Sequence, residues 1–109
     1  MEPTPKDVQF YKTLDDKCPF KSWLDFLKDK TARARILVRL RRLEQGNLGD
    51  YRPVGKGVCE LKIDYGPGYR LYFVQVKATV VLILGGGDKS TQESDILKAQ
   101  KYWEEYGNR

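Results

Sequence analysis

The stretch between residues 58 and 87 constrains the fold most, because it holds three strand-like runs joined by short breaks. The first run, VCELKIDY (58–65), alternates between two faces. One face carries Cys59, Leu61, Ile63 and Tyr65, and the other carries Val58, Glu60, Lys62 and Asp64. After the GPG break, YRLYFVQV (69–76) alternates again, and TVVLILGGG (79–87) is continuously apolar up to its glycines. Three such strands predict an antiparallel meander whose third strand is covered inside the sheet.

Two segments before the meander show the periodicity of amphipathic helices. CPFKSWLDFLKD (18–29) places Pro19 in its first turn, and its apolar face consists of Phe20, Trp23, Leu24 and Leu27. TARARILVRLRRLEQGN (31–47) has Thr31 as a candidate N-cap and Gly46 as its stop. The apolar face of this second segment consists of Ala32, Ile36, Leu40 and Leu43. The short connection between the segments predicts an antiparallel helical hairpin.

The remaining segments complete one α+β domain over residues 1–109. Residues 6–13 predict a short first strand, and residues 46–57, rich in turn formers, predict a loop. A last helix is predicted after Lys89, where Ser90 and Glu93 fit a capping box. Its apolar face would consist of Ile96, Ala99, Trp103 and Tyr106. The order β-αα-βββ-α predicts a two-layer fold with the helices on one face of the sheet and the other face open.

The charged composition restricts both the partners and the chemistry. A net charge of +5 favours an anionic partner, most commonly nucleic acid, although many small basic proteins are simply soluble. The chain has no histidine, which excludes histidine-based acid–base catalysis and most zinc sites. We therefore expect neither a metal nor a cofactor. Two cysteines are too few for a disulfide framework, and no signal-peptide core is present, so the sequence predicts a cytoplasmic protein.

The glycine-rich stretch LILGGGDKSTQESD (82–95) looks like a phosphate-binding loop but lacks its spacing. A P-loop places lysine directly after glycine. Here Asp88 separates Gly87 from Lys89, and the position where the first glycine should stand is Leu82. The stretch therefore predicts a strand end, a glycine turn and a helix start. Lys89 remains open as either a solvated side chain or a phosphate contact.

One face of the meander gathers Glu60, Lys62, Arg70 and Tyr72, since side chains alternate along strands. One interpretation is a wet sheet face with cross-strand pairs, Glu60 with Arg70 or Lys62 with Tyr72. The other is a site for phosphodiester chemistry, in which a ribose 2′-hydroxyl attacks the adjacent phosphorus. Arginine suits the charge that develops there, and clustered cations lower the pKa of a neighbouring lysine or tyrosine.

A stripe of arginines follows the second predicted helix. Arg35, Arg39 and Arg42 lie at helical spacing beside its apolar face. Such a stripe is either a solvated face, a contact with an RNA or ribosomal RNA backbone, or a contact with an acidic partner protein. We predict that Arg35, Arg39, Arg42 and the loop residue Lys56 form an RNA- and ribosome-binding set.

The segments CELKIDYGPGYRLYFVQV and VVLILGGGDKSTQESDILKAQKYW carry a family resemblance. The chain resembles the RelE/HigB-type toxins of type II toxin–antitoxin modules, in the phage-derived branch called Gp49-like or addiction module killer protein. PFKSWLDFLKDKTARARILVRLRRLEQGNLGDYRPVG matches its upstream part, so the resemblance covers about residues 6–105. It implies a RelE-like fold, with a helical hairpin and a C-terminal helix on a small twisted antiparallel sheet and the first strand at one edge. It also implies metal-independent cleavage of mRNA on the ribosome, and an antitoxin partner that often carries a helix-turn-helix.

The resemblance assigns roles to individual residues. Arg70 matches the arginine of the family's G-Y-R strand, which stabilises the phosphorane. Lys62 matches a basic residue that acts as base or charge stabiliser, and Lys89 matches one near the leaving group. The family's best-studied members carry a second lysine at the position of Glu60. Glu60 and Tyr72 therefore join the catalytic candidates.

The sequence leaves two other functions open. ParE-like relatives share the fold and inhibit DNA gyrase by binding, without catalysis. An inactive copy would bind only its antitoxin or RNA. Mapping of RNA ends after induced expression separates nuclease from gyrase inhibitor, and normal growth without the antitoxin would indicate an inactive module.

Overall fold

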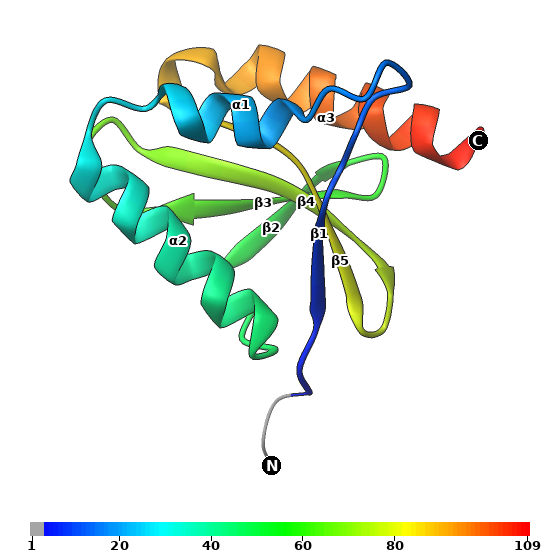
Figure 1. Cartoon of the computed structure of the whole chain (residues 1–109), viewed down its shortest axis with the longest axis horizontal. Helices are drawn as coiled ribbons and strands as arrows, with labels where there is room; N and C mark the ends of the chain where they lie inside the picture. The colour runs from blue at the N-terminus through cyan, green and yellow to red at the C-terminus, as the bar shows by residue number, and fades with distance from the viewer. Residues whose placement is uncertain (1–3) are drawn as a thin grey trace.

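A computed structural model describes residues 4–109 as an α+β fold, as the sequence predicted. The strands are β1 (Asp7–Phe10), β2 (Tyr51–Gly55), β3 (Val58–Ile63), β4 (Tyr69–Lys77) and β5 (Val80–Gly87). The helices are α1 (Pro19–Phe26), α2 (Lys30–Glu44), the 3₁₀ turn η1 (Lys89–Thr91) and α3 (Gln92–Gly107). Figure 1 shows α1 and α2 on the near side of the twisted sheet and α3 passing behind α1.

The sheet has the strand order β1-β5-β4-β3-β2, and its three central strands form the predicted meander. The register pairs Leu61 with Leu71 and Lys62 with Arg70, so the GPG turn leaves the predicted faces intact. β1 occupies one edge, as the family resemblance implied. However, β1 runs parallel to β5, so the sheet is mixed and not wholly antiparallel. The two helices carry the chain from β1 at one edge to β2 at the other, and the antiparallel strands then return it to β5 beside β1.

The predicted loop at residues 46–57 was wrong in part, because its second half forms the edge strand β2. β2 pairs antiparallel with β3, and Arg52 lies opposite Glu60. Pro53 has no backbone N–H to donate, and an edge strand tolerates this because its outer side has no partner strand. The turn to β3 uses Gly55, Lys56 and Gly57, all with positive φ. The turn-forming residues of this segment gave no local sign of a strand. The strand forms because it pairs with β3.

The prediction of one open sheet face was also wrong, because helices cover both faces. The first core lies under α1 and α2 and contains the predicted faces of both helices together with Leu61, Leu71 and Phe73. The second core lies under α3, where Ala99 is buried and Ile96, Trp103 and Tyr106 are half-buried against the sheet. The strand residues beneath α3 are Val58, Tyr72, Val74, Leu82 and Leu84. A continuously apolar strand needs cover on both faces, and α3 supplies the second cover.

The helix starts differ from the predicted caps. Asp29, not Thr31, caps α2: its carboxylate accepts from the backbone N–H groups of Thr31 and Ala32, at 3.0 and 3.1 Å. Before α3, Asp88 accepts from the N–H of Ser90 at 2.8 Å and starts the 3₁₀ turn. The predicted Ser90–Glu93 capping box therefore does not form, since the aspartate two residues before Ser90 accepts its backbone N–H instead.

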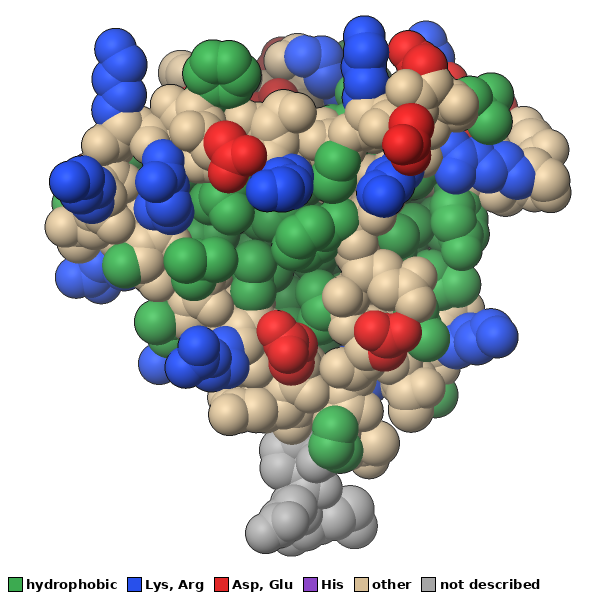
Figure 2. Space-filling model, in the orientation of Figure 1, with side chains coloured by type: hydrophobic (Ala, Val, Ile, Leu, Met, Phe, Trp, Pro, Cys, Tyr) green, Lys and Arg blue, Asp and Glu red, His purple; other side chains and the backbone are tan. Residues whose placement is uncertain are grey.

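The near face of the molecule is partly apolar. In Figure 2, hydrophobic side chains gather between α1, α2 and β1, with charged side chains around them. Phe10 of β1 and Leu37 of α2 are among the exposed large hydrophobic residues. None of the helices within residues 4–109 is both long and apolar enough to cross a bilayer.

Candidate active site

Lys62, Arg70 and Lys89 line one shallow cavity of about 410 Å³. The cavity lies where β3 ends, the GPG turn reverses the chain, β4 begins and η1 follows β5. Its other lining residues are Asp64, Tyr65, Gly66, Pro67 and Gly68. The three cations that the sequence singled out from separate segments therefore converge on a single surface hollow.

The GPG turn brings η1 to the start of β4. Gly66 and Gly68 have φ values of 57° and 78°, a region that favours glycine, and this allows the tight reversal. The backbone N–H of Lys89 donates to the carbonyl of Pro67 at 3.4 Å and fastens η1 to the turn. A side chain on Gly68 would approach Nη1 of Arg70 to 3.1 Å, so this glycine also leaves room for the guanidinium.

Arg70 is buried but held in a fixed orientation at the cavity wall. Its side chain is 8% exposed, and Nη1 donates to the carbonyl of Gly68 at 2.6 Å. Its Nε lies 3.6 Å from Oε2 of Glu60, which makes an ion pair too long for a hydrogen bond. A buried guanidinium needs such partners to offset the loss of hydration. The arrangement presents a permanent positive charge to the hollow with little freedom to move.

Glu60 is the buried anion that neutralises this charge. Its carboxylate is 4% exposed and accepts from Nε of Arg52 and from Nε2 of Gln92, both at 2.9 Å. Burial alone would raise the pKa of Glu60, but the hydrogen bonds from Gln92 and Arg52 outweigh it and hold the pKa below its usual value. Glu60 is therefore ionised at neutral pH and poorly suited to accept a proton.

Tyr72 lies opposite Glu60 on the neighbouring strand and is fully buried beneath α3. Among the described residues its hydroxyl has no hydrogen-bond partner within ordinary geometry. Burial and then the charge of Glu60 raise the pKa of Tyr72 far above its usual value. Tyr72 does not line the cavity that holds the three cations.

Lys62 is the most accessible member of the site on the sheet. Its side chain is 56% exposed, and its ammonium lies 3.5 Å from the exposed carboxylate of Asp64. An exposed pair of this kind holds its partners only weakly. Lys62 lies opposite Arg70, so the predicted alternative pairing of Lys62 with Tyr72 does not occur, whereas Glu60 and Arg70 do form an ion pair.

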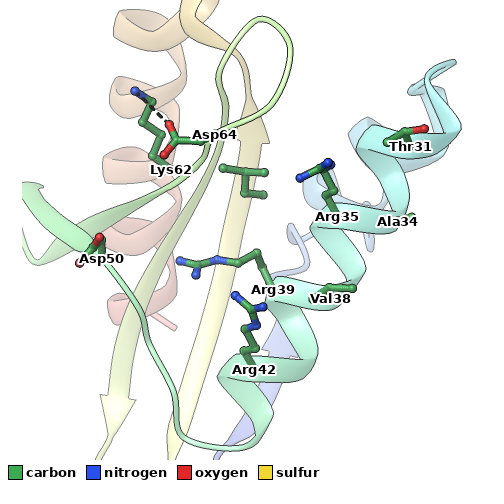
Figure 3. A pocket seen from close by; sticks show the side chains of 10 residues that line it. Thr31, Ala34, Arg35, Val38, Arg39, Arg42, Asp50, Lys62 and Asp64 are labelled. Atoms are coloured by element: carbon green, nitrogen blue, oxygen red, sulfur yellow. Dashed lines mark ion pairs between the residues drawn. The ribbon is translucent and has the colours of Figure 1, made fainter.

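The arginine stripe of α2 borders a second and larger hollow, of about 750 Å³, which also reaches Lys62. Figure 3 shows Arg35, Arg39 and Arg42 extending from α2 toward the strands, with Asp50 on the far side. Lys56 lies elsewhere: it occupies the β2–β3 turn at the other end of β3. The structure thus brings together three members of the predicted RNA-binding set and separates the fourth.

Sequence reasoning missed two residues that shape the site. Arg52 was assigned to a loop, and only the pairing of β2 with β3 places it opposite Glu60. Gln92 begins α3 and reaches Glu60 across 32 positions of sequence. Neither residue carries a local pattern that points to Glu60, because both contacts depend on tertiary placement.

Comparison with known proteins identifies relatives of this chain. Residues 22–104 match the family model described as "Phage derived protein Gp49-like (DUF891)". An uncharacterized protein of Haemophilus influenzae is 47% identical over 88 residues, which cover 81% of this chain and 89% of the relative. Residues 22–104 include all three cavity cations and α2.

Proposed function

We propose a function from the family of this chain, which belongs to the phage-derived Gp49-like proteins, a family associated with toxin modules. In this proposal the protein is the toxin of a type II toxin–antitoxin module and acts as a ribosome-dependent mRNA endoribonuclease. The observation that carries the proposal is the convergence of Lys62, Arg70 and Lys89 on one open hollow. Its partners would be mRNA on the ribosome and a cognate antitoxin, which from the family resemblance alone is expected to be a helix-turn-helix protein.

The proposed reaction is an intramolecular transesterification of the RNA strand. The ribose 2′-oxygen forms a bond to the adjacent phosphorus while the bond to the 5′-oxygen breaks, which leaves a 2′,3′-cyclic phosphate and a 5′-hydroxyl. The 2′-hydroxyl gives up its proton, and the leaving 5′-oxygen takes one. In the transition state, extra negative charge develops on the phosphoryl oxygens. Fixed cations stabilise this charge and so lower the activation barrier.

The geometry suits Arg70 for that charge. Its guanidinium is oriented before substrate arrives, by Gly68 on one side and Glu60 on the other. A planar fork can contact two phosphoryl oxygens at once, and a fixed donor needs no reorganisation during reaction. In the proposal Arg70 therefore binds the scissile phosphate.

Lys62 and Lys89 would serve the two ends of the reaction. Both are exposed and approach the hollow from different elements, β3 and η1. We assign Lys62 to the attacking 2′-oxygen and Lys89 to the leaving 5′-oxygen. Glu60 is a positioning residue in this scheme, because its buried carboxylate holds Arg70 and is tied to α3 through Gln92.

Induced expression in a bacterial host without the antitoxin tests the proposal. Growth should stop, and mapping of RNA 5′ ends should find new ends inside translated codons. Lys89→Ala should remove these ends, whereas Lys77→Ala, an exposed lysine at the far end of β4, should keep them. Growth arrest with a DNA-damage response and no new RNA ends would instead support gyrase inhibition, and normal growth would support an inactive module.

A further inference from the structure

The first of the three glycines that end β5 is not explained by the packing around it. An added Cβ at Gly86 would come within 2.5 Å of the Trp23 ring, and one at Gly87 would meet the carboxylate of Asp95. An added Cβ at Gly85 would meet no atom within 4 Å. Gly85 is also not among the glycines with positive φ, so other residues could adopt its backbone conformation. Glycine weakens a strand interior, yet neither a contact nor the backbone requires it at this position.

Gly85 lines a small pocket between α1 and α3 (Figure 1). β1 pairs with β5 only as far as Ile83, so no strand in the described part of the chain lies beside Gly85 on that edge. The volume of the pocket is about 200 Å³. Sites for drug-sized ligands measure about 300–1,000 Å³, so this pocket suits a single ring system. It shares no lining residue with the cavity that holds Lys62, Arg70 and Lys89.

Two aromatic rings line the pocket, Trp23 from α1 and Tyr102 from α3. Both side chains are half-buried. The Tyr102 ring stacks on Tyr11 with a centroid separation of 5.0 Å, and the Trp23 ring meets Tyr69 edge-on at 6.1 Å. These contacts hold both rings in place before a ligand arrives. Fixed aromatic walls favour a flat ligand, because its faces can stack on them.

Two charged side chains of α3, Asp95 and Lys98, also line the pocket. They lie one turn apart, yet within residues 4–109 neither of them forms an ion pair. Asp95 is half-buried, and its Oδ2 accepts from the hydroxyl of Thr91 at 2.6 Å. This contact holds the carboxylate in a fixed orientation. The pocket therefore presents a hydrogen-bond acceptor and a cationic donor beside each other on its α3 side.

We propose that this pocket binds the guanine ring of a nucleotide, either free or within an RNA strand. One edge of guanine carries two N–H donors, at N1 and N2, next to the acceptor O6. The ring would lie against Trp23 and Tyr102, with its donors on Asp95 and its O6 on Lys98. Adenine has an acceptor at N1, which would face the carboxylate of Asp95 without a proton between them. Because the pocket is separate from the cavity of the three cations, the inference does not depend on nuclease activity.

Titration calorimetry of the full-length protein tests the proposal with two pairs of probes. The free nucleotides are GMP and AMP, and the strands are UUGUU and UUAUU. Both strands carry 2′-O-methyl groups, which block the proposed cleavage, so nuclease activity does not affect the titration. GMP should bind at least about tenfold more tightly than AMP if the pocket takes free nucleotides, and UUGUU should show the same preference over UUAUU if it takes RNA. Either preference supports a guanine pocket and identifies its source.

Variants of the pocket should change this binding in different ways. Gly85→Val should weaken binding of the preferred probe by about tenfold or more, because its side chain occupies the pocket. Asp95→Asn should reduce the preference for guanine over adenine to about twofold or less, since a neutral amide can face either base. Lys98→Gln should weaken guanine binding, whereas Lys101→Gln, an exposed lysine of α3 outside the pocket, should leave it unchanged.

Thermal unfolding shows which variants remain folded. Three results would each overturn the proposal: no binding of any probe to the wild type, equal binding of guanine and adenine probes, or wild-type affinity in a folded Gly85→Val. If Gly85→Val does not fold, Asp95→Asn decides, and an unchanged preference for guanine in that variant would contradict the proposed pose.

Discussion

Lys62 of β3 and Arg70 of β4 lie directly opposite each other, so two cations share one cross-strand position. Like charges in this arrangement destabilise a sheet. Glu60 and Asp64 reduce the cost, because each pairs with one of the two cations. A sheet selected only for stability would not place two positive charges here. Two adjacent cations of this kind are what the proposed phosphate-binding role of the surface requires.

Lys62→Thr should leave the protein as stable as the wild type or more stable by about 0.2–1 kcal/mol, because it removes the repulsion with Arg70 and adds a good strand former. Urea denaturation measures the change in free energy of unfolding. Lys77→Thr is the matched control, since Lys77 is also an exposed strand lysine but lies opposite Val80. If Lys62→Thr clearly loses stability and Lys77→Thr does not, the repulsion between Lys62 and Arg70 is already relieved in the wild type.

Glu60→Ala should destabilise the fold by about 1–3 kcal/mol, because it leaves the buried Arg70 without its anion and Gln92 without its acceptor. Arg52→Ala removes an exposed partner of the same carboxylate, so it should cost less than about 1 kcal/mol. Chemical denaturation of both variants provides the comparison. Equal losses would show that Glu60 acts mainly through β2 and not through the candidate site.

Gly86→Ala should destabilise the protein by about 1–3 kcal/mol, whereas Gly85→Ala should change stability by less than about 1 kcal/mol. An added Cβ at Gly86 would come within 2.5 Å of the Trp23 ring, but at Gly85 it would meet nothing within 4 Å. Thermal unfolding of the two variants tests this difference. If both behave alike, α1 can shift away from β5 and the packing of Trp23 is not a constraint.

Stability should fall on the acid side as carboxylates with lowered pKa values become protonated. The folded-state pKa of Glu60 lies below the usual glutamate value of 4.5, so the stabilising effect of the ionised Glu60 is present above pH 4.5 and is lost as the pH falls through the folded-state pKa. The difference in unfolding free energy between wild type and Glu60→Gln should therefore shrink between about pH 7 and pH 3. A difference that stays constant over this range would contradict the assignment of an ionised Glu60.

Much of the fold could be predicted from the sequence because its elements are strongly periodic. Ala32, Ile36, Leu40 and Leu43 were read from spacing alone, and all four are buried. The second cover of the sheet was missed although a signal existed. β5 is apolar at successive positions, so helices on one face alone cannot bury all of its side chains.

The candidate site could be predicted only in part, because half of it depends on tertiary contacts. Alternation placed Glu60, Lys62, Arg70 and Tyr72 on one face, and the register of β3 with β4 agrees. Alternation could not show that α3 buries Tyr72 or that Gln92 reaches Glu60. Those features follow from how α3 packs, which no local pattern encodes.

Cleavage of mRNA in a reconstituted translation system tests the central claim most directly. Purified ribosomes stalled on a defined message are mixed with wild type, Lys62→Ala, Arg70→Lys, Lys89→Ala or Lys77→Ala, and cut RNA ends are mapped over time. The wild type and Lys77→Ala should cut within codons at equal rates. Each of the other variants should be slower by about 10²-fold or more while remaining folded by circular dichroism. Wild-type protein that leaves the message intact, or site variants that cut at the wild-type rate, would contradict the account.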